Sequence, residues 1–248
     1  MNRQLILLFG NQRTCSSVTV DILREHRCNI FLAGGGGDYW RWCQELGDVI
    51  RFDGMLYQYL YGHHESAPFR QCSELLAKHE GYGIADSYPL TWYDTALRFL
   101  DRLCEPIDVL KHPGMCLCWD LWKRVIPKSD HTVTIGMMLR NPYQIAKSYE
   151  RRDRNRGQHH EAYGLIDAYF RAQQQIINEG EYPIFPVRAD NLKRDIERLL
   201  SAVSVPFNPA RFDSIFEQQR GTLHAFQSDD HPVFKRYAEL SKWAETFD

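Results

Sequence analysis

The segment from Gln4 to Val18 constrains the fold of this chain more than any other. An unbroken apolar run, Leu5 to Phe9, passes through a glycine into a short polar stretch that ends in Ser16-Ser17. Such a run is typical of a parallel strand covered on both faces, and Gly10 permits a sharp exit from it. We expect a helix to begin at Ser16-Ser17, with its unpaired N–H groups and positive dipole end facing the loop. The segment therefore predicts a strand, a loop and a helix arranged around an anion.

The loop lacks two residues of the usual ATP- or GTP-binding pattern, G-x-x-x-x-G-K-[ST]. Cys15 replaces the second glycine and Ser16 replaces the lysine, so the central cation of that pattern is missing. Donors of a different kind remain, in the side chains of Arg13, Thr14, Ser16 and Ser17. Because ordinary helix capping also produces a glycine followed by serines, the loop alone does not identify a ligand.

A second strand, turn and helix are predicted between His131 and Arg152. Arg140 closes the apolar strand, and Asn141-Pro142 marks the turn because proline is well tolerated in a first helical turn. Ser148 follows Arg140 by eight residues, so a turn and nearly two helical turns could bring its hydroxyl toward the guanidinium. An arginine and a serine that converge in this way suit a phosphate monoester.

Both segments resemble parts of the sulfotransferases that use 3′-phosphoadenosine 5′-phosphosulfate (PAPS). The first resembles their 5′-phosphosulfate loop, G-x-x-[RK]-[ST]-G-[TS]-[TS], and departs from it at Cys15. The second resembles the segment that holds the 3′-phosphate, with Arg140 and Ser148 at its two ligand positions. The implied cofactor-binding residues are Gly10, Asn11, Gln12, Arg13, Thr14, Cys15, Ser16, Ser17, Arg140 and Ser148.

Two further segments extend the resemblance. Lys111-His112-Pro113 looks like a compressed form of the family's Lys-x-His-x-Pro segment, and Tyr182 to Leu192 resembles its later strand and Tyr-Glu-Asp-Leu turn. The similarity runs from Gln4 to about Pro206 and is weakest between about Ala33 and Tyr88, the region expected to border the acceptor.

The resemblance implies sulfuryl transfer from PAPS to an acceptor hydroxyl, with adenosine 3′,5′-bisphosphate as product and no metal ion. By analogy with phosphoryl transfer the transition state is loose, so positioned cations are the main requirement. The implied catalytic residues are Arg13 against the sulfuryl and bridging oxygens, Lys111 as a second cation, and His112 as the base. His63, His64 and Glu65 are rival candidates for the base.

Bulk properties fit a cytoplasmic enzyme with one domain over residues 1–248. The 30 basic and 32 acidic residues nearly balance, so we expect no nucleic acid partner and a purely local anion site. No stretch approaches the roughly 20 apolar residues of a membrane span. Seven scattered cysteines without a paired framework indicate reduced thiols. The partner is a small-molecule or glycan acceptor whose identity, like the oligomeric state, is not legible from the sequence.

The order of the predicted elements indicates an α/β fold with a mainly parallel central sheet flanked by helices. Strands are predicted at about 4–9, 28–32, 107–111, 132–139 and 183–187. Helices are predicted at about 16–27, 38–46, 72–79, 89–104, 115–125, 143–153, 161–178 and 190–203, with a glycine run, Gly34 to Gly37, before the second of them. The basic run Arg151 to His160 is predicted to be either a solvated face or a lid over an anion.

Two alternatives to a PAPS-dependent sulfotransferase stay open from the sequence. One is a small-molecule kinase with a degenerate phosphate loop, in which Asp86 would bind Mg²⁺ or act as the base. The other is a sulfotransferase-like module that binds nucleotide without catalysis, which the Cys15 substitution and the compressed Lys111-His112-Pro113 segment keep open.

Overall fold

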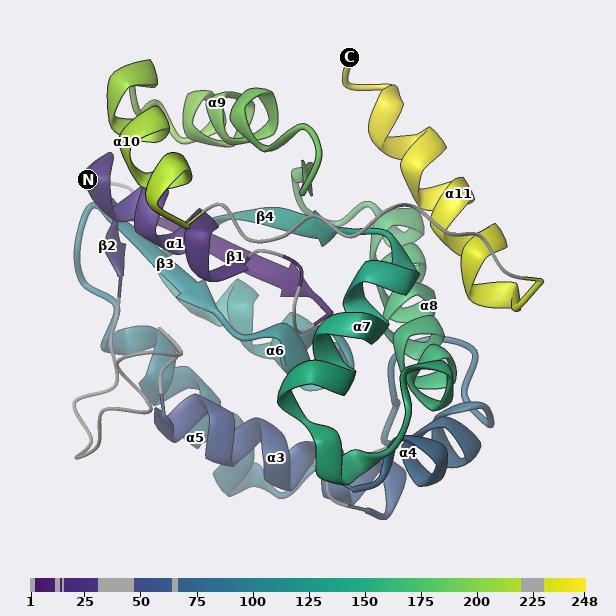
Figure 1. The fold of residues 1–248 in the computed structure, drawn as a ribbon. Coiled ribbons are helices and arrows are strands. Elements are labelled where there is room, and N and C mark those ends of the chain that lie inside the picture. The colour runs from purple at the N-terminus through teal and green to yellow at the C-terminus, as the bar shows by residue number, and fades with distance from the viewer. Residues whose placement is uncertain (1–2, 12–13, 15, 31–46, 64–66, 220–229) are drawn as a thin grey trace.

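The structure of the protein is a computed structural model that describes residues 3–11, 14, 16–30, 47–63, 67–219 and 230–248. In these residues five parallel strands form one sheet in the order β2-β3-β1-β4-β5. Figure 1 shows the sheet in the middle of the molecule with helices above and below it. The strands are β1 (Arg3–Gly10), β2 (Asn29–Ile30), β3 (Ile107–Lys111), β4 (His131–Leu139) and β5 (Ile184–Arg188).

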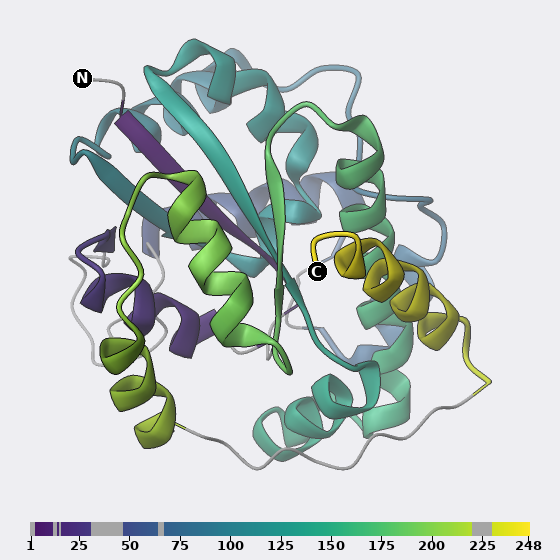
Figure 2. The same ribbon diagram turned by 90° about the horizontal axis from the view of Figure 1, so that it is seen from above.

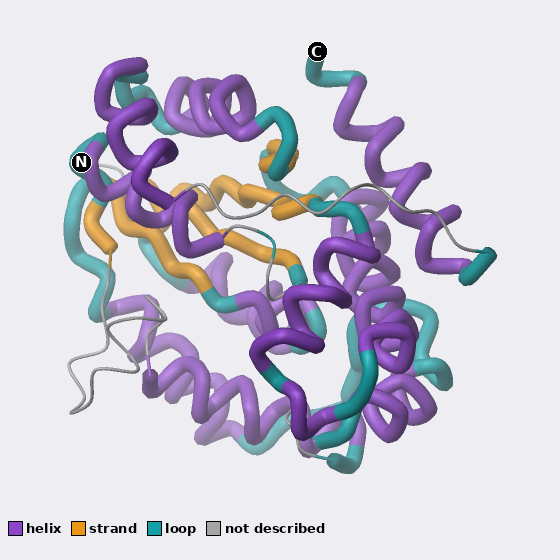
Figure 3. Tube along the Cα trace, in the orientation of Figure 1, coloured by secondary structure: helices purple, strands orange, loops and turns teal. Residues whose placement is uncertain are grey.

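The described residues also form ten α-helices, which Figure 3 colours apart from the strands. No helix in the described part of the chain is long and apolar enough to cross a membrane. The helices are α1 (Ser16–Glu25), α3 (Gly47–Tyr61), α4 (Phe69–Leu76), α5 (Leu90–Asp101), α6 (Trp119–Val125), α7 (Pro142–Arg152), α8 (Tyr163–Glu179), α9 (Leu192–Ala202), α10 (Pro209–Gln219) and α11 (Pro232–Glu245).

The sheet separates two hydrophobic cores because side chains alternate between its faces along each strand. Leu5, Leu7 and Phe9 of β1 pack into the larger core with residues of α3, α5, α6, α7 and α8. Ile6 and Leu8 point the other way, into a smaller core formed with α1, α9 and α10. Figure 2, seen from above, shows α9 lying across the strands on this second face, with α10 next to α1. Apolar residues on both faces explain why β1 reads as a continuous apolar run.

The strand order brings three separate parts of the sequence to one edge of the sheet. β1 lies between β3 and β4, with Leu8 paired to Lys111 and Gly10 paired to Met138. Since all strands are parallel, their carboxyl ends face the same side, and in Figure 1 α7 begins beside the arrowheads of β1 and β4. In open α/β sheets ligands bind beyond this edge, where the strand order reverses.

The α/β class and the parallel sheet predicted from the sequence are confirmed. The predicted helix at 115–125 is divided, because a 3₁₀ turn (Pro113–Cys116) precedes α6 and Cys118 between them has a non-helical backbone. Of the predicted strand 28–32, Asn29–Ile30 form β2 and Cys28 precedes it outside the strand. Residues 31–32, Gly34 to Gly37 and the predicted helix 38–46 lie outside the described residues. The helices α3, α10 and α11 were not predicted.

Candidate active site

Three segments singled out by the sequence meet at the carboxyl edge of the sheet. The Gly10–Ser17 loop leaves β1 and leads into α1, Lys111-His112 ends β3, and Arg140 follows β4 directly. These are neighbouring strands, so the predicted donor loop lies between the other two segments. The N-termini of α1 and α7 both begin at this edge, which makes it favourable for anions.

Gly10 ends β1 where a side chain has no room. Its φ is +151°, and an added Cβ would lie 2.6 Å from the Cβ and 2.9 Å from the carbonyl oxygen of Met138. Gln173 of α8 donates to the same carbonyl at 3.1 Å, which holds the end of β4 against α8. The glycine is therefore required by close backbone packing between β1 and β4, in addition to the sharp turn that the sequence predicts.

Asn11 and Thr14 hold the loop in place with their side chains. Asn11 is fully buried; its amide donates to the carbonyl of Ile166 at 3.3 Å, and its oxygen accepts from the Tyr149 hydroxyl at 3.2 Å. The Thr14 hydroxyl donates to the carbonyl of Asn11 at 2.7 Å. The sequence analysis assigned the Thr14 hydroxyl to the ligand; in the structure its proton is bonded within the loop, so the side chain shapes the loop.

The remaining loop residues are described only in part. Gln12, Arg13 and Cys15 lie outside the described residues. The backbone of Ser16 forms the start of α1, and Ser17 is exposed in its first turn. The predicted roles of Arg13 and Cys15 therefore stay predictions, whereas Ser17 is accessible to a ligand at this helix terminus.

Lys111 and His112 lie on opposite faces of the sheet. Lys111 shares its strand face with Val109, which packs in the core beside α1. His112 follows Leu110 in the alternation and points into the larger core on the α3 side. Both side chains are 4% exposed. The ammonium group of Lys111 is thus directed toward the α1 side of the sheet, and the imidazole of His112 toward the α3 side.

The imidazole of His112 is held by a buried carboxylate. Its Nδ1 lies 2.6 Å from Oδ2 of Asp53 in α3, and Nε1 of Trp122 in α6 donates to Oδ1 of the same carboxylate at 2.7 Å. Asp53 is 1% exposed and Trp122 is fully buried. Neither residue was predicted from the sequence. A signal existed for Asp53, because it lies within the buried stripe of α3 that Val49, Phe52 and Leu56 also form.

His63, a rival candidate for the base, has partners at both ring nitrogens. Its Nδ1 lies 3.2 Å from the carbonyl oxygen of Tyr61, and its Nε2 lies 3.2 Å from the Tyr57 hydroxyl. A carbonyl only accepts, so Nδ1 carries the proton and Nε2 accepts from Tyr57. This geometry gives His63 a role in holding the end of α3. The other two rivals, His64 and Glu65, lie outside the described residues.

Arg140, Gln144 and Ser148 follow one another at intervals of four residues along one side of α7 and its N-terminus. Nε of Arg140 donates to Oε1 of Gln144 at 3.1 Å, which orients the guanidinium along this line. Ser148 is buried at 9% exposure, and Asn141 caps the helix by accepting from the backbone N–H of Tyr143 at 3.0 Å. Gln144, absent from the sequence prediction, is part of this stripe.

Part of the basic run that follows α7 is tied down. Nε of Arg156 donates to the carbonyl of Ala67 at 3.0 Å, and its guanidinium lies 4.6 Å from the ring centroid of Phe69. His159 contacts Glu150 at 3.2 Å, and Lys147 with His159 holds the pKa of Glu150 below its usual range. The other arginines of the run, Arg151, Arg152 and Arg154, are exposed.

Cys116, in the 3₁₀ turn after β3, is a poor nucleophile because its thiol is fully buried. Burial raises the pKa of Cys116, and its backbone hydrogen bonds, one of them with Gly10, offset only part of this shift. The thiol of Cys118 donates to the backbone carbonyl of Asp53 at 3.7 Å. The five cysteines in the described residues form no disulfide with one another. Within those same ranges no cluster of three or more histidine, cysteine or acidic side chains is arranged to hold a metal ion.

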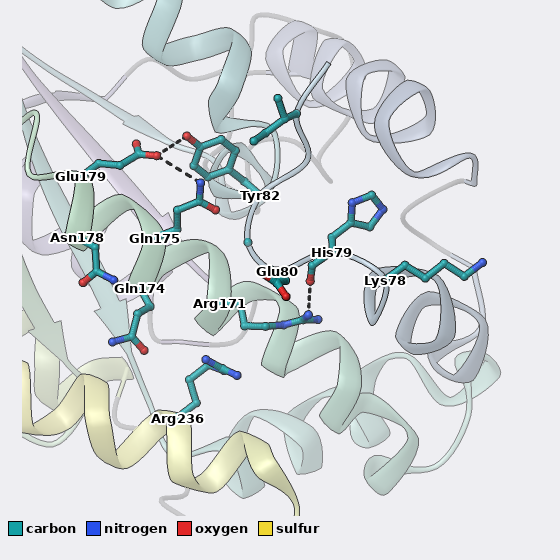
Figure 4. Close-up of a pocket in the computed structure, with 12 residues that line it drawn as sticks. Lys78, His79, Glu80, Tyr82, Arg171, Gln174, Gln175, Asn178, Glu179 and Arg236 are labelled. Atoms are coloured by element: carbon teal, nitrogen blue, oxygen red, sulfur yellow. Dashed lines mark hydrogen bonds between the residues drawn. The ribbon is translucent and has the colours of Figure 1, made fainter. Parts of the chain in front are cut away.

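A cavity of about 780 Å³ lies elsewhere, between α8, α11 and the segment after α4. Figure 4 shows Arg171, Glu179 and Tyr82 lining it. Arg171 donates to the carbonyl of Leu76 at 2.9 Å, and the Tyr82 hydroxyl donates to Glu179 at 2.6 Å. The cavity contains none of the predicted site residues. It is therefore not the candidate site.

Comparison with known proteins gives a structural match only. No protein-family model matches this chain, and no curated protein sequence does. The chain is similar in structure to the sulfotransferase domain of the olefin synthase from Synechococcus PCC 7002, over 97% of this chain and 94% of that one, at 14% identity and a TM-score of 0.54. Sulfotransferase STF1 from Mycobacterium tuberculosis H37Rv aligns over 96% of this chain and 77% of that one, at 11% identity and a TM-score of 0.44. The chain therefore has the sulfotransferase fold.

Proposed function

We propose that this protein is a PAPS-dependent sulfotransferase that transfers a sulfuryl group to a hydroxyl of a small-molecule or glycan acceptor. One observation carries the proposal: the Gly10–Ser17 loop, Lys111-His112 and Arg140 with Ser148 lie at the carboxyl ends of three adjacent parallel strands. The sulfotransferase fold of the chain supports the same reading.

The residues at this edge fit a nucleotide with separate 5′ and 3′ anionic groups. The N-terminus of α1 and the Ser17 hydroxyl offer donors to the 5′-phosphate, since free N–H groups and the helix dipole favour an anion. Arg140, oriented by Gln144, and Ser148 offer donors to the 3′-phosphate. When bound, PAPS supplies an activated sulfuryl group.

In the proposed reaction His112 takes the proton of the acceptor hydroxyl at Nε2. The acceptor oxygen then forms its bond to sulfur while the bond between sulfur and the bridging phosphate oxygen breaks. Arg13 and Lys111 stabilise the charge that develops on the bridging oxygen, in a loose transition state like that of phosphoryl transfer. The products are a sulfated acceptor and adenosine 3′,5′-bisphosphate, with the proton on His112.

The kinase alternative lacks the lysine of the usual ATP-binding loop, because Ser16 stands at that position. Asp86, its suggested metal ligand or base, is exposed in the loop between α4 and α5. Binding experiments alone do not separate an enzyme from a catalytically inactive module that binds the same nucleotide. Turnover separates them.

Turnover of PAPS is measured by the release of adenosine 3′,5′-bisphosphate in the presence of phenolic, aliphatic and glycan hydroxyls. We expect acceptor-dependent release by the wild type and a loss of roughly 10²- to 10⁴-fold for His112→Ala, the usual contribution of a positioned base. A nitrophenol already ionised at the assay pH should recover much of this loss, because it needs no base.

A matched control is His131→Ala, which removes a histidine at the opposite end of β4 whose Nε2 contacts the carbonyl of Leu103. It should keep wild-type turnover. The proposal is wrong if the wild type releases no bisphosphate with any acceptor class, or if it transfers phosphate from Mg-ATP instead.

A further inference from the structure

Three elements far apart in the sequence converge on one buried carboxylate. Asp53 lies in the middle of α3, His112 follows β3, and Trp122 is in α6. Both oxygens of the carboxylate are used, one by the imidazole at 2.6 Å and the other by the indole at 2.7 Å. This arrangement fixes the carboxylate from two directions.

Packing alone does not account for an acid at this position. Asp53 is 1% exposed within the apolar stripe of α3, where Val49 and Leu56 are fully buried. Burying an ionised carboxylate is costly unless it is paired, and an apolar side chain of similar size is often as stable or more so. Burial of Asp53 therefore has a free-energy cost that its hydrogen-bonded contact with His112 offsets.

The contact determines which nitrogen of His112 is basic. An ionised carboxylate only accepts hydrogen bonds, so the Nδ1 of the neutral imidazole carries its proton and Nε2 holds the lone pair. When Nε2 gains a proton, the adjacent carboxylate stabilises the resulting imidazolium, an effect strengthened by the low dielectric of the interior. Trp122 keeps the carboxylate in the orientation that serves Nδ1.

We propose that Asp53 is a positioning residue for His112, which it holds in the Nδ1-protonated tautomer so that the lone pair lies on Nε2. This inference rests on the proposed function, because it assigns His112 the role of base. Trp122 acts through Asp53 and completes a line from indole to carboxylate to imidazole. Asp53 acts on the reaction through His112 and does not touch the substrate.

The main test is Asp53→Asn, which keeps the size of the side chain but presents an amide to the imidazole. In the Ser-His-Asp hydrolases the same change lowers kcat by about 10⁴ through the wrong tautomer. We expect kcat here to fall by roughly 10²- to 10⁴-fold, with the KM for PAPS nearly unchanged. An ionised nitrophenol should recover most of the loss, as we also expect for His112→Ala. A purely structural role would instead lower all rates equally, with no such recovery.

Two further variants accompany this measurement. Trp122→Phe removes one hydrogen bond to Asp53 but leaves the contact with His112, so its loss of kcat should be smaller than that of Asp53→Asn. The control, Asp120→Asn, alters another buried acid, 2% exposed and paired with Arg124 at 2.9 Å, which does not contact His112. It should lower the melting temperature without a loss that the ionised nitrophenol restores.

An NMR measurement on the resting protein separates this inference from the proposed function. The ¹⁵N and ¹H resonances of His112, assigned by their absence in His112→Gln, should show the Nδ1-protonated tautomer in the wild type and a shift toward the other tautomer in Asp53→Asn. An Nε2-protonated imidazole in the wild type, or wild-type kcat in a folded Asp53→Asn, overturns the role of Asp53. If the Nδ1 tautomer is present and PAPS is not turned over, the proposed function falls while the coupling of Asp53 to His112 stands.

Discussion

At the scale of single residues, the end of β1 is shaped by contacts that only glycine permits. Gly10 combines a φ of +151° with backbone contact to Met138, so the candidate phosphate loop leaves the sheet at a point fixed by β4. Asn11 then ties the loop to α7 and α8 through Tyr149 and Ile166. The loop is thus positioned by the core on the α3 side, although its helix, α1, packs on the other face.

Gly10→Ala should destabilise the protein. The added methyl group meets the Met138 carbonyl at 2.9 Å and its Cβ at 2.6 Å, and overpacking of this kind costs about 1–3 kcal/mol before any backbone strain is counted. The measurement is the free energy of unfolding in urea. Gly54→Ala is the control, because Gly54 lies within α3 with nothing inside 4 Å of an added Cβ. It should stabilise the helix by about 0.5–1 kcal/mol. Equal stability of Gly10→Ala and wild type would show that β1 and β4 can separate freely.

The sequence predicted the location of a residue best where that residue directly follows a recognisable apolar strand. His112 and Arg140 each follow an apolar strand, so their location at the sheet edge could be inferred from the strand alone. The partner of His112 could not be inferred in this way, because Asp53 lies 59 residues away in the sequence and reaches His112 only through the packing of α3 on the sheet. The acid within the apolar stripe of α3 was the one available signal.

At the scale of elements, the β4–α7 unit organises the predicted 3′-phosphate site. Proline at the first helical position and the Asn141 cap start the helix directly after the strand. This start sets Gln144 and Ser148 one helical turn apart on one side of α7, and it brings Arg140, just before the cap, within hydrogen-bond distance of Gln144. The sequence predicted this unit closely because both its turn residues and its apolar face are local signals.

Arg140→Ala should weaken binding of adenosine 3′,5′-bisphosphate far more than that of adenosine 5′-phosphate. A charge-assisted contact is worth about 1.5–3 kcal/mol, which corresponds to roughly 10- to 100-fold in Kd. Calorimetric titration of both ligands measures the difference. Arg211→Ala is the charge-matched control, since Arg211 of α10 is exposed and donates to the carbonyl of Glu25 at 2.6 Å, at the far end of α1. An equal loss for both ligands would remove Arg140 from the 3′-phosphate site.

Other elements were harder to predict for identifiable reasons. Gly54 lies within α3 and lowers the helix propensity of that segment. The buried face of α3 is formed partly by aromatic residues and an acid. Only Val233, Leu240 and Ala244 of α11 are buried, so its apolar stripe is thin. Both helices are held by tertiary packing, α3 against the core and α11 against α8.

At the scale of the whole molecule, the sheet divides the candidate site into two sides. The α1 side carries the donor loop's helix and, by strand alternation, the side chain of Lys111. The α3 side carries His112 with Asp53 and Trp122. A donor bound at the ends of β1 and β4 would therefore have His112 on its α3 side. We expect the acceptor to bind on that same side. The parallel arrangement of the strands was predictable from the alternation of strands and helices along the sequence. The placement of Lys111 and His112 on opposite sides could be seen only from the pleat and register of β3 in the structure.

The central claim is that the carboxyl edge of β3, β1 and β4 binds a 3′-phosphorylated adenine nucleotide. Titration of the wild-type protein with adenosine 3′,5′-bisphosphate and, separately, with Mg-ATP tests it most directly. We expect the bisphosphate to bind at least roughly 10-fold more tightly than Mg-ATP, since Arg140 and Ser148 address the 3′-phosphate and the loop lacks the lysine that a triphosphate requires. Tighter binding of Mg-ATP, or no binding of the bisphosphate, would contradict this account.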